Sequence, residues 1–212
     1  MPELDHLIFA ATDLATGVAH IEGITGATAV AGGPHPGVGT HNALLTFDDV
    51  TYFEVIAIDP DQPEPERARP FGLDDGVGPR LAGYAIHPAP GETIEDVVEL
   101  LRSAGHDPGP VASMSRVRPD GVELAWRLTR GAVEGVPAPV PFVIEWGDTP
   151  SPATSVPSMG SLVELRVDHP DAGARTVVDA VATAVGSGLV AGDGPARLTA
   201  RVETPDGVVE IS

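Results

Sequence analysis

The stretch LDHLIFA, from Leu4 to Ala10, is an apolar run of strand length that sets the pattern for the rest of the chain. Two similar runs follow it, LAGYAIH from Leu81 to His87 and SLVELRV from Ser161 to Val167. They begin roughly 80 residues apart, and each is followed at once by a helical pattern. The sequence therefore indicates a structural unit that is repeated about three times.

Each predicted helix is amphipathic and has recognisable ends. The first lies behind Asp13, a residue type that caps helix N-termini, and the second lies behind Thr93 and ends at Gly105. The third ends at Gly186. Because apolar residues occupy one face of each helix, each helix should pack on one face of a sheet.

Further strand candidates follow each helix and are separated by turn residues. They are HNALLTF and TYFEVIAI in the first unit, SRVR, VELAWRLT and VPFVIEW in the second, and ARLTARVE and VVEIS in the third. Two PDG turns, at 119–121 and 205–207, predict tight hairpins because Gly tolerates positive φ.

The predicted fold class is α+β, with repeated βαβββ modules forming a curved mixed sheet around a cleft and a partial third module at the C-terminus. We expect a first module at 1–60, a linker at 61–79, a second module at 80–148 and the partial third module at 158–212. One such unit cannot bury its sheet alone, which favours pairing of two units. A generic α+β sandwich with chance regularity is the alternative.

Composition excludes several classes of protein. There is no Cys, so thiol nucleophiles and Cys-held metals are excluded, and all 12 basic residues are Arg, so lysine Schiff bases are excluded too. A net charge of −19 argues against nucleic acid as a partner. No apolar stretch reaches the length of a membrane span, and we expect a cytoplasmic protein that does not enter a membrane.

The order of elements, together with LDHLIFA and YFEVIAI, resembles the vicinal-oxygen-chelate superfamily of glyoxalases, bleomycin-resistance proteins and dioxygenases. The resemblance is closer still to its glyoxalase-like domain branch, through GGPHPGVGTHNALL (Gly32 to Leu45) and PFVIEW (Pro141 to Trp146). It covers about residues 3 to 148, and the segment from Ser161 onwards looks like an appended unit.

The family holds its metal on the first and fourth strands of each unit, so the resemblance implies a divalent metal site of His6, Glu54 and Glu145. The remaining first-strand position falls at Gly83 or Tyr84, neither of which is a ligand of this kind. This weakens the dioxygenase reading. A glyoxalase-type site would have His6, Glu54 and Glu145 as its three protein ligands, with His41 or His87 as a conceivable substitute for the fourth. The metal would be Zn, Ni, Mn or Fe, and a protein without any metal is the alternative.

Glu54 also attracts attention without the resemblance, because a carboxylate in an otherwise apolar strand is costly unless it is paired or functional. The competing interpretations are an ion pair with an Arg for Glu54 and a hydrogen-bonded core residue for His6. We expect Glu54 and Glu145 to be catalytic. The expected substrate-binding residues are His35, His41, Asn42, Arg127 and Trp146.

Three hypotheses about function follow. The first is a metal-dependent lyase or isomerase that moves a proton on a small substrate rich in carbonyl or enediol oxygens. The second is a metal-free protein of the bleomycin-resistance type that binds or sequesters a small molecule. The third is a fold that has lost its site and serves in assembly. The resemblance allows a homodimer as well as a monomer.

Overall fold

The computed structural model describes residues 1–76, 78–117, 121–130, 138–186 and 188–212. In chain order the elements are β1 (Glu3–Ala10), α1 (Leu14–Thr25), β2 (Val30–His35), β3 (Thr40–Thr46), β4 (Tyr52–Ile58), η1 (Pro70–Asp75), β5 (Arg80–His87), α2 (Ile94–Ser103), β6 (Val111–Val117), β7 (Glu123–Thr129), β8 (Phe142–Glu145), η2 (Pro152–Thr154), β9 (Ser161–Asp168), α3 (Ala172–Val185), β10 (Leu189–Gly192), β11 (Arg197–Thr204) and β12 (Gly207–Ile211). The three predicted strand-then-helix starts are confirmed.

The first two units build one mixed sheet with the strand order β2-β3-β4-β1-β5-β8-β7-β6. In each unit the first strand pairs in parallel with the last, β1 with β4 and β5 with β8. The two units join through the antiparallel pair β1 and β5. This arrangement confirms the predicted α+β fold of paired βαβββ modules.

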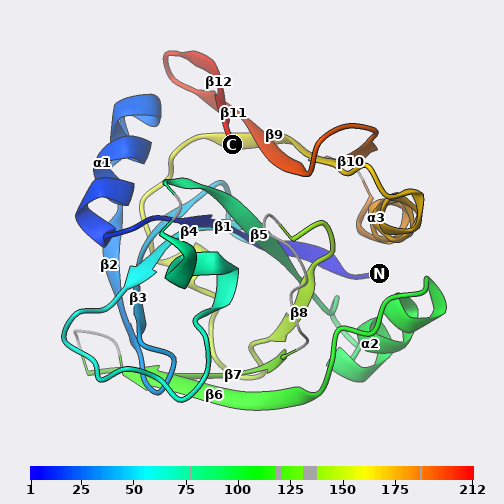
Figure 1. Cartoon of the computed structure of the whole chain (residues 1–212), viewed down its shortest axis with the longest axis horizontal. Helices are drawn as coiled ribbons and strands as arrows, with labels where there is room; N and C mark the ends of the chain where they lie inside the picture. Colours follow the sequence, from blue (N-terminus) through cyan, green and yellow to red (C-terminus); the bar gives the residue numbers. More distant parts are fainter. Residues whose placement is uncertain (77, 118–120, 131–137, 187) are drawn as a thin grey trace.

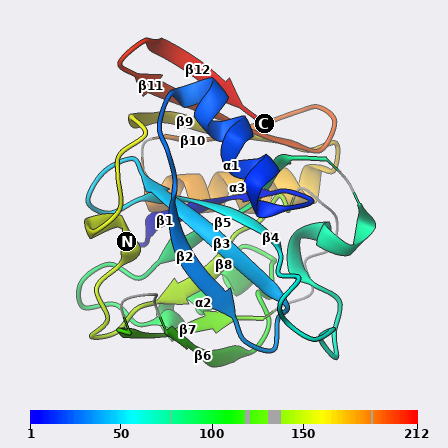
Figure 2. The same ribbon diagram turned by 90° about the vertical axis from the view of Figure 1, so that its left-hand side faces the viewer.

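The sheet curves until its two edge strands, β2 and β6, approach each other (Figures 1 and 2). The guanidinium of Arg116 on β6 donates a hydrogen bond to the carbonyl oxygen of Gly32 on β2. Because both strands are edges, this contact links the far ends of the two units and nearly closes the sheet around its concave face.

The C-terminal segment repeats the element order of a unit but not its strand pairing. Its sheet has the order β10-β9-β11-β12, so the first strand, β9, pairs in parallel with β10 and not with the last strand. This sheet lies over β1 and β5 on the convex side of the large sheet (Figure 1). The expected boundaries at 1–60, 61–79, 80–148 and 158–212 stay a prediction.

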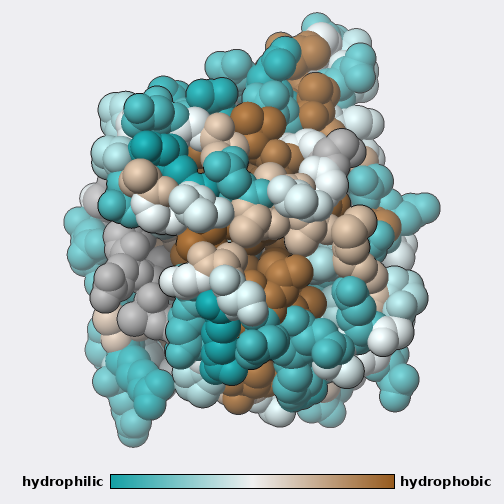
Figure 3. All heavy atoms as spheres, turned by 90° about the vertical axis from the view of Figure 1, so that its right-hand side faces the viewer, coloured by the Kyte–Doolittle hydropathy of each residue, from teal (hydrophilic) through white to brown (hydrophobic). Residues whose placement is uncertain are grey.

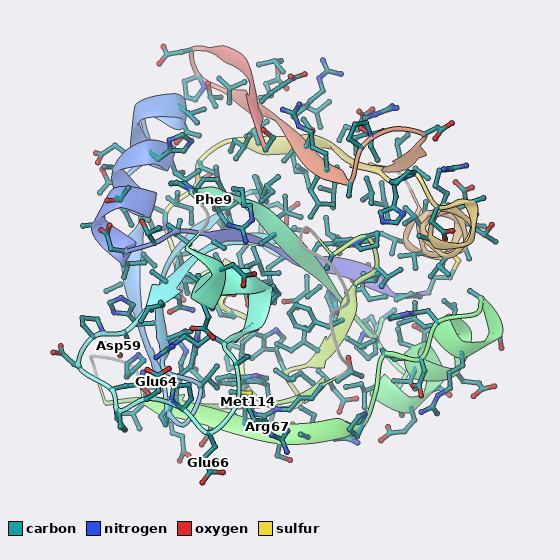
Figure 4. The ribbon with its side chains drawn as sticks, viewed as in Figure 1. Phe9, Asp59, Glu64, Glu66, Arg67 and Met114 are labelled. Atoms are coloured by element: carbon teal, nitrogen blue, oxygen red, sulfur yellow. The ribbon has the colours of Figure 1, made fainter. Side chains whose placement is uncertain are left out.

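The main core lies between the convex face of the large sheet and the layer formed by the three helices and the small sheet. Strand alternation directs one set of side chains to this core and the other set to the concave face. Figure 4 shows the difference, since Phe9 on β1 lies toward the small sheet whereas Met114 on β6 lies on the inner side.

The helix ends follow the expected chemistry. Asp13 accepts a hydrogen bond from the Thr16 backbone, and Thr93 forms a reciprocal capping box with Asp96. The first helix continues past Gly23 and ends at Gly26, whose φ of 72° suits a glycine C-cap. The turn expected at 119–121 lies in part outside the described residues, whereas the one at 205–207 connects β11 and β12 as expected.

The face that carries α2 and α3 is hydrophilic at its margins, with apolar residues gathered toward its middle (Figure 3). Among the helices in the described ranges, none combines the length and the apolar character needed to cross a bilayer.

Candidate functional site

A cavity of about 1790 Å³ is lined by the concave face of the large sheet, by the segments 67–75 and 104–110 and by residues at the start of α3. This exceeds the usual size of a small-molecule pocket, about 300 to 1,000 Å³. Polar side chains gather on the wall contributed by the first unit. They are His6, His35, Asn42, Tyr52 and Glu54.

Glu54 is the central group of this wall. Its side chain faces inward with those of Tyr52 and Ile56, while the intervening Phe53 and Val55 enter the main core. Glu54 is only 7% exposed, and Asn42 donates a hydrogen bond to its Oε1 at 2.6 Å. The Nε2 atoms of His6 and His35 lie 3.6 Å from Oε2 and 3.8 Å from Oε1 respectively.

His6 is held from behind by Asp5, although neighbouring residues on a strand normally point to opposite faces. The pairing of β1 with β5 shifts register between Leu4 and His6, and such a bulge can turn both side chains to one side. The Nδ1 of His6 lies 2.5 Å from Asp5 Oδ1, and both residues are at most 2% exposed. Since a carboxylate accepts, Nδ1 carries the hydrogen and Nε2 is directed toward Glu54.

Trp146 completes this chain of contacts from the second unit. Its Nε1 donates a hydrogen bond of 3.0 Å to the other oxygen of Asp5. The ring of His6 stacks on Tyr52 at a centroid distance of 4.4 Å. Burial, with the nearby carboxylates of Asp5 and Glu54, raises the pKa of Tyr52 and keeps its phenol protonated.

His35 closes the outer side of the polar wall. It ends the edge strand β2 and is partly buried. Its Nδ1 lies 2.9 Å from the Thr40 hydroxyl, and its Nε2 lies 3.3 Å from the Asn42 amide nitrogen. Burial lowers the pKa of His35, and although Glu54 opposes this shift, the ring is favoured in its neutral form.

Asn42 lies between His35 and Glu54, and its amide oxygen is buried. The residue is 4% exposed, and its Oδ1 has no hydrogen-bond partner among the residues that the structure describes. The amide rests against Gly32 of β2, where a Cβ atom would collide with it. A glycine at this position therefore lets the Asn42 side chain lie flat beside Glu54.

Glu145 and Arg127 are not brought together with His6 and Glu54. On β8 the inward positions are Phe142 and Ile144, so Glu145 points to the opposite side. There it accepts hydrogen bonds from the backbone of Ile94, at the start of α2, and from Arg127. Arg127 also pairs with Glu95. Glu145 therefore links β8 to the N-terminus of α2.

The remaining expected site residues divide between the cavity and the outside. Trp146 and Asn42 line the cavity. His41, next to Asn42 on β3, lies on the other side, where its Nδ1 is 3.9 Å from Asp59. The Nε2 of His87 lies 3.6 Å from Glu3 Oε2, and both residues line a separate, smaller hollow.

The donor groups around the cavity do not fit the expected three-ligand metal site. The first unit offers His6, His35 and Glu54, but the corresponding strands of the second unit turn Gly83 and Ala85, and Phe142 and Ile144, toward this side. Within the described residues, no three His, Cys, Asp or Glu side chains are grouped so that they could hold one ion. A structural or catalytic metal usually needs at least three protein ligands.

The sequence reasoning overlooked Asp5, Tyr52 and Phe71. Strand alternation predicts that Asp5 and His6 point to opposite faces, and nothing in LDHLIFA reveals the bulge. Tyr52 could have been found, because it lies two residues before Glu54 on the same strand and must share its face. Phe71 comes from the Pro-rich segment that was read only as a linker.

A model of the glyoxalase-like domain family matches residues 4–184. Among curated protein sequences, none matches this chain. A solved structure of a hypothetical protein from Staphylococcus aureus shares 17% identity with a TM-score of 0.59, covering 100% of this chain and 82% of that one. Methylmalonyl-CoA epimerase from Mycobacterium tuberculosis shares 18% identity with a TM-score of 0.41, covering 67% of this chain and 85% of that one.

The Staphylococcus aureus likeness, at this identity, concerns the fold. The family match reaches beyond residue 148, where the resemblance in sequence had been placed, and takes in β9 and most of α3. Together with the paired βαβββ modules, it shows that the chain belongs to the glyoxalase-like domain family of the vicinal-oxygen-chelate superfamily.

Proposed function

We propose that this protein is an enzyme that moves a proton on a small oxygen-rich carbonyl compound, and that Glu54 is the group that takes the proton. The observation that carries this proposal is the nearly buried Glu54 carboxylate at the wall of a large cavity, with Asn42 and two imidazoles as its described partners. A carboxylate is retained in such a place at considerable cost, which favours a functional role.

The neighbours of Glu54 suit proton transfer. Asn42 fixes one carboxylate oxygen and leaves the other beside His6 Nε2 at 3.6 Å. Because catalytic hydrogen bonds are often long before a substrate binds, this spacing allows a proton to pass between the two groups once the site closes on a ligand. Abstraction of a proton next to a carbonyl is the first step of isomerase and lyase reactions of this kind.

The test is hydrogen exchange at carbon. Phenylpyruvate and pyruvate, incubated with the protein in D₂O, should gain deuterium at the carbon next to the carbonyl, as followed by NMR. Replacing Glu54 by Gln removes the base, and we expect a loss of about 100-fold or more. Glu145→Gln is the matched control, because Glu145 lies on the other side of the sheet. Equal exchange by the Glu54→Gln variant would contradict the proposal.

The metal-dependent form of this reaction requires ligands that the second unit does not supply. Metal analysis of the untagged protein, after supplementation with Zn, Ni, Mn or Fe, should find far less than one ion per chain. Near-stoichiometric metal that disappears in both His6→Ala and Glu54→Ala would restore the metal-dependent lyase or isomerase.

A second candidate is a protein that binds and sequesters its ligand without converting it. The size of the cavity and its aromatic side favour this alternative. Binding of a probe without any exchange at carbon, in the unaltered protein, would select it over the enzyme.

A further inference from the structure

The aromatic residues of this chain are concentrated at the cavity. The sequence contains five Phe, two Trp and two Tyr. Both Trp, Tyr52, Phe71 and Phe142 line the cavity. The other four, Phe9, Phe47, Phe53 and Tyr84, pack in the main core. In a chain that builds its core mostly from aliphatic residues, this distribution needs a reason other than folding.

Most of these rings form a wall that adjoins the polar residues, since the Phe142 ring lies 5.5 Å from the His6 ring and the Trp146 ring lies 6.5 Å from the Tyr52 ring, measured between centroids. Trp126 and Phe142 lie on strands of the second unit and pack with Ala85 and Ile144. The rings of Trp126 and Trp146 have centroids 5.4 Å apart, and those of Phe71 and Phe142 are 6.1 Å apart. These are separations at which aromatic rings attract one another and can accept a further ring.

Phe71 is the most informative of the wall residues because its backbone is strained. In the described residues it is the only non-glycine with positive φ, at 60°. A bulky side chain adopts this conformation only at an energetic cost, and such strain is concentrated at ligand-binding sites.

The strained backbone places the Phe71 ring against Gly83 of β5. A Cβ atom on Gly83 would lie 3.1 Å from the edge of the ring. Gly83 is one of the two positions, with Tyr84, at which the resemblance would put a metal ligand of the second unit, and it is the one of the two that meets this ring. An aromatic surface therefore occupies the place where that ligand would project.

We propose that the cavity takes a ligand with two parts, a planar aromatic ring held by Phe71, Phe142 and the two Trp, and an oxygen-bearing end placed at Glu54 and Asn42. This specifies the substrate class and rests on the proposed function for the oxygen-bearing end. The aromatic part of the proposal depends only on the wall of Phe71, Phe142 and the two Trp, and not on the proposed function.

Two pairs of probes test the aromatic part, phenylpyruvate with pyruvate and mandelate with lactate. Within each pair the polar end is the same and only the ring differs. Calorimetric titration measures the affinities, and because both Trp line the cavity, quenching of intrinsic fluorescence gives a second readout. We expect each ring-bearing probe to bind at least about tenfold more tightly than its partner, as burial of an apolar ring predicts.

Phe71→Leu keeps an apolar side chain but removes the ring. It should weaken phenylpyruvate several-fold and leave pyruvate unchanged. Glu54→Gln should keep the preference for the ring while losing exchange at carbon, so failure of the proposed function and failure of this inference give different results. A preference below about twofold in both pairs, an unaltered preference in Phe71→Leu, or no binding of any of the four probes would overturn the inference.

Discussion

The inner faces of the two units differ although their strands pair in the same way. On β1 and β4 the first unit presents His6, Tyr52 and Glu54, whereas β5 and β8 of the second present Gly83, Ala85 and apolar side chains. Their outer faces are alike, because both pack aliphatic and aromatic residues into one core. The outer face maintains the fold, so the inner face is free to change its chemistry.

After the loss of Glu54 itself, the largest effect should come from the residue that supports this polar wall. Asp5→Asn keeps an oxygen that can accept from Trp146 but offers His6 Nδ1 an amide in place of a carboxylate. We expect His6 to lose its fixed tautomer and exchange at carbon to fall about 100-fold, the size of a lost acid–base contribution.

Nitrogen NMR of the imidazole reads the tautomer directly and does not depend on turnover. In the unaltered protein, His6 should be protonated at Nδ1. Replacing Asp5 by Glu gives a control that retains the carboxylate. An unchanged His6 spectrum in Asp5→Asn would show that Asp5 only supports the fold and does not position the imidazole.

A matched pair of glycines separates the two inner faces. Gly32→Ala drives a methyl group into the Asn42 amide, and such overpacking costs about 1 to 3 kcal/mol. It should impair exchange at carbon by displacing Asn42 from Glu54. Gly83→Ala makes a milder contact with the Phe71 ring and should reduce the preference for aromatic probes instead.

The two glycine variants are compared in three measurements. These are denaturant unfolding, exchange at carbon and the affinity for the probes. If Gly83→Ala impaired exchange as strongly as Gly32→Ala, the two faces would not act separately. In that case the cavity would be one site whose parts cannot be assigned to different units.

The fold could be predicted from the sequence because it depends on repeated local signals. LDHLIFA, LAGYAIH and SLVELRV are each followed by a helix pattern with its own cap, and the structure contains all three. The strands β2 and β10 were not predicted, since VAGGPH and LVAG are short and rich in glycine. Their pairing is decided by neighbouring strands and not by their own sequence.

The site could be predicted only where one strand settles the direction of a side chain. Glu54 was found because it interrupts a buried run, and alternation then places it beside Tyr52 on the cavity side. Glu145 looked similar in VIEW, but a register one residue different turns it to the helix side. Asp5 and Phe71 depend on a bulge and on a strained turn, which sequence patterns do not reveal.

Glu145 offers a smaller effect, confined to stability. It accepts a hydrogen bond from the first turn of α2 and another from Arg127. Glu145→Gln keeps the shape and removes the charge, so we expect a loss of about 1 kcal/mol in the free energy of unfolding. Urea denaturation measures it. A strong loss of exchange at carbon without a change in stability would return Glu145 to the catalytic site.

The smallest effect concerns pH and His35. Burial lowers the pKa of this imidazole below its ordinary value of 6.5, against the opposing charge of Glu54, and the nearby Arg116, His41 and His6 lower it further. The unfolded chain therefore binds the proton more readily than the folded one, so the stabilisation is complete above 6.5 and is lost as the pH falls toward the folded pKa. His35→Gln removes this titration. Its free energy of unfolding, measured by urea denaturation over the same pH range, should fall less steeply on acidification than that of the unaltered protein. Two parallel curves would mean that the buried imidazole does not contribute to the acid sensitivity of the fold.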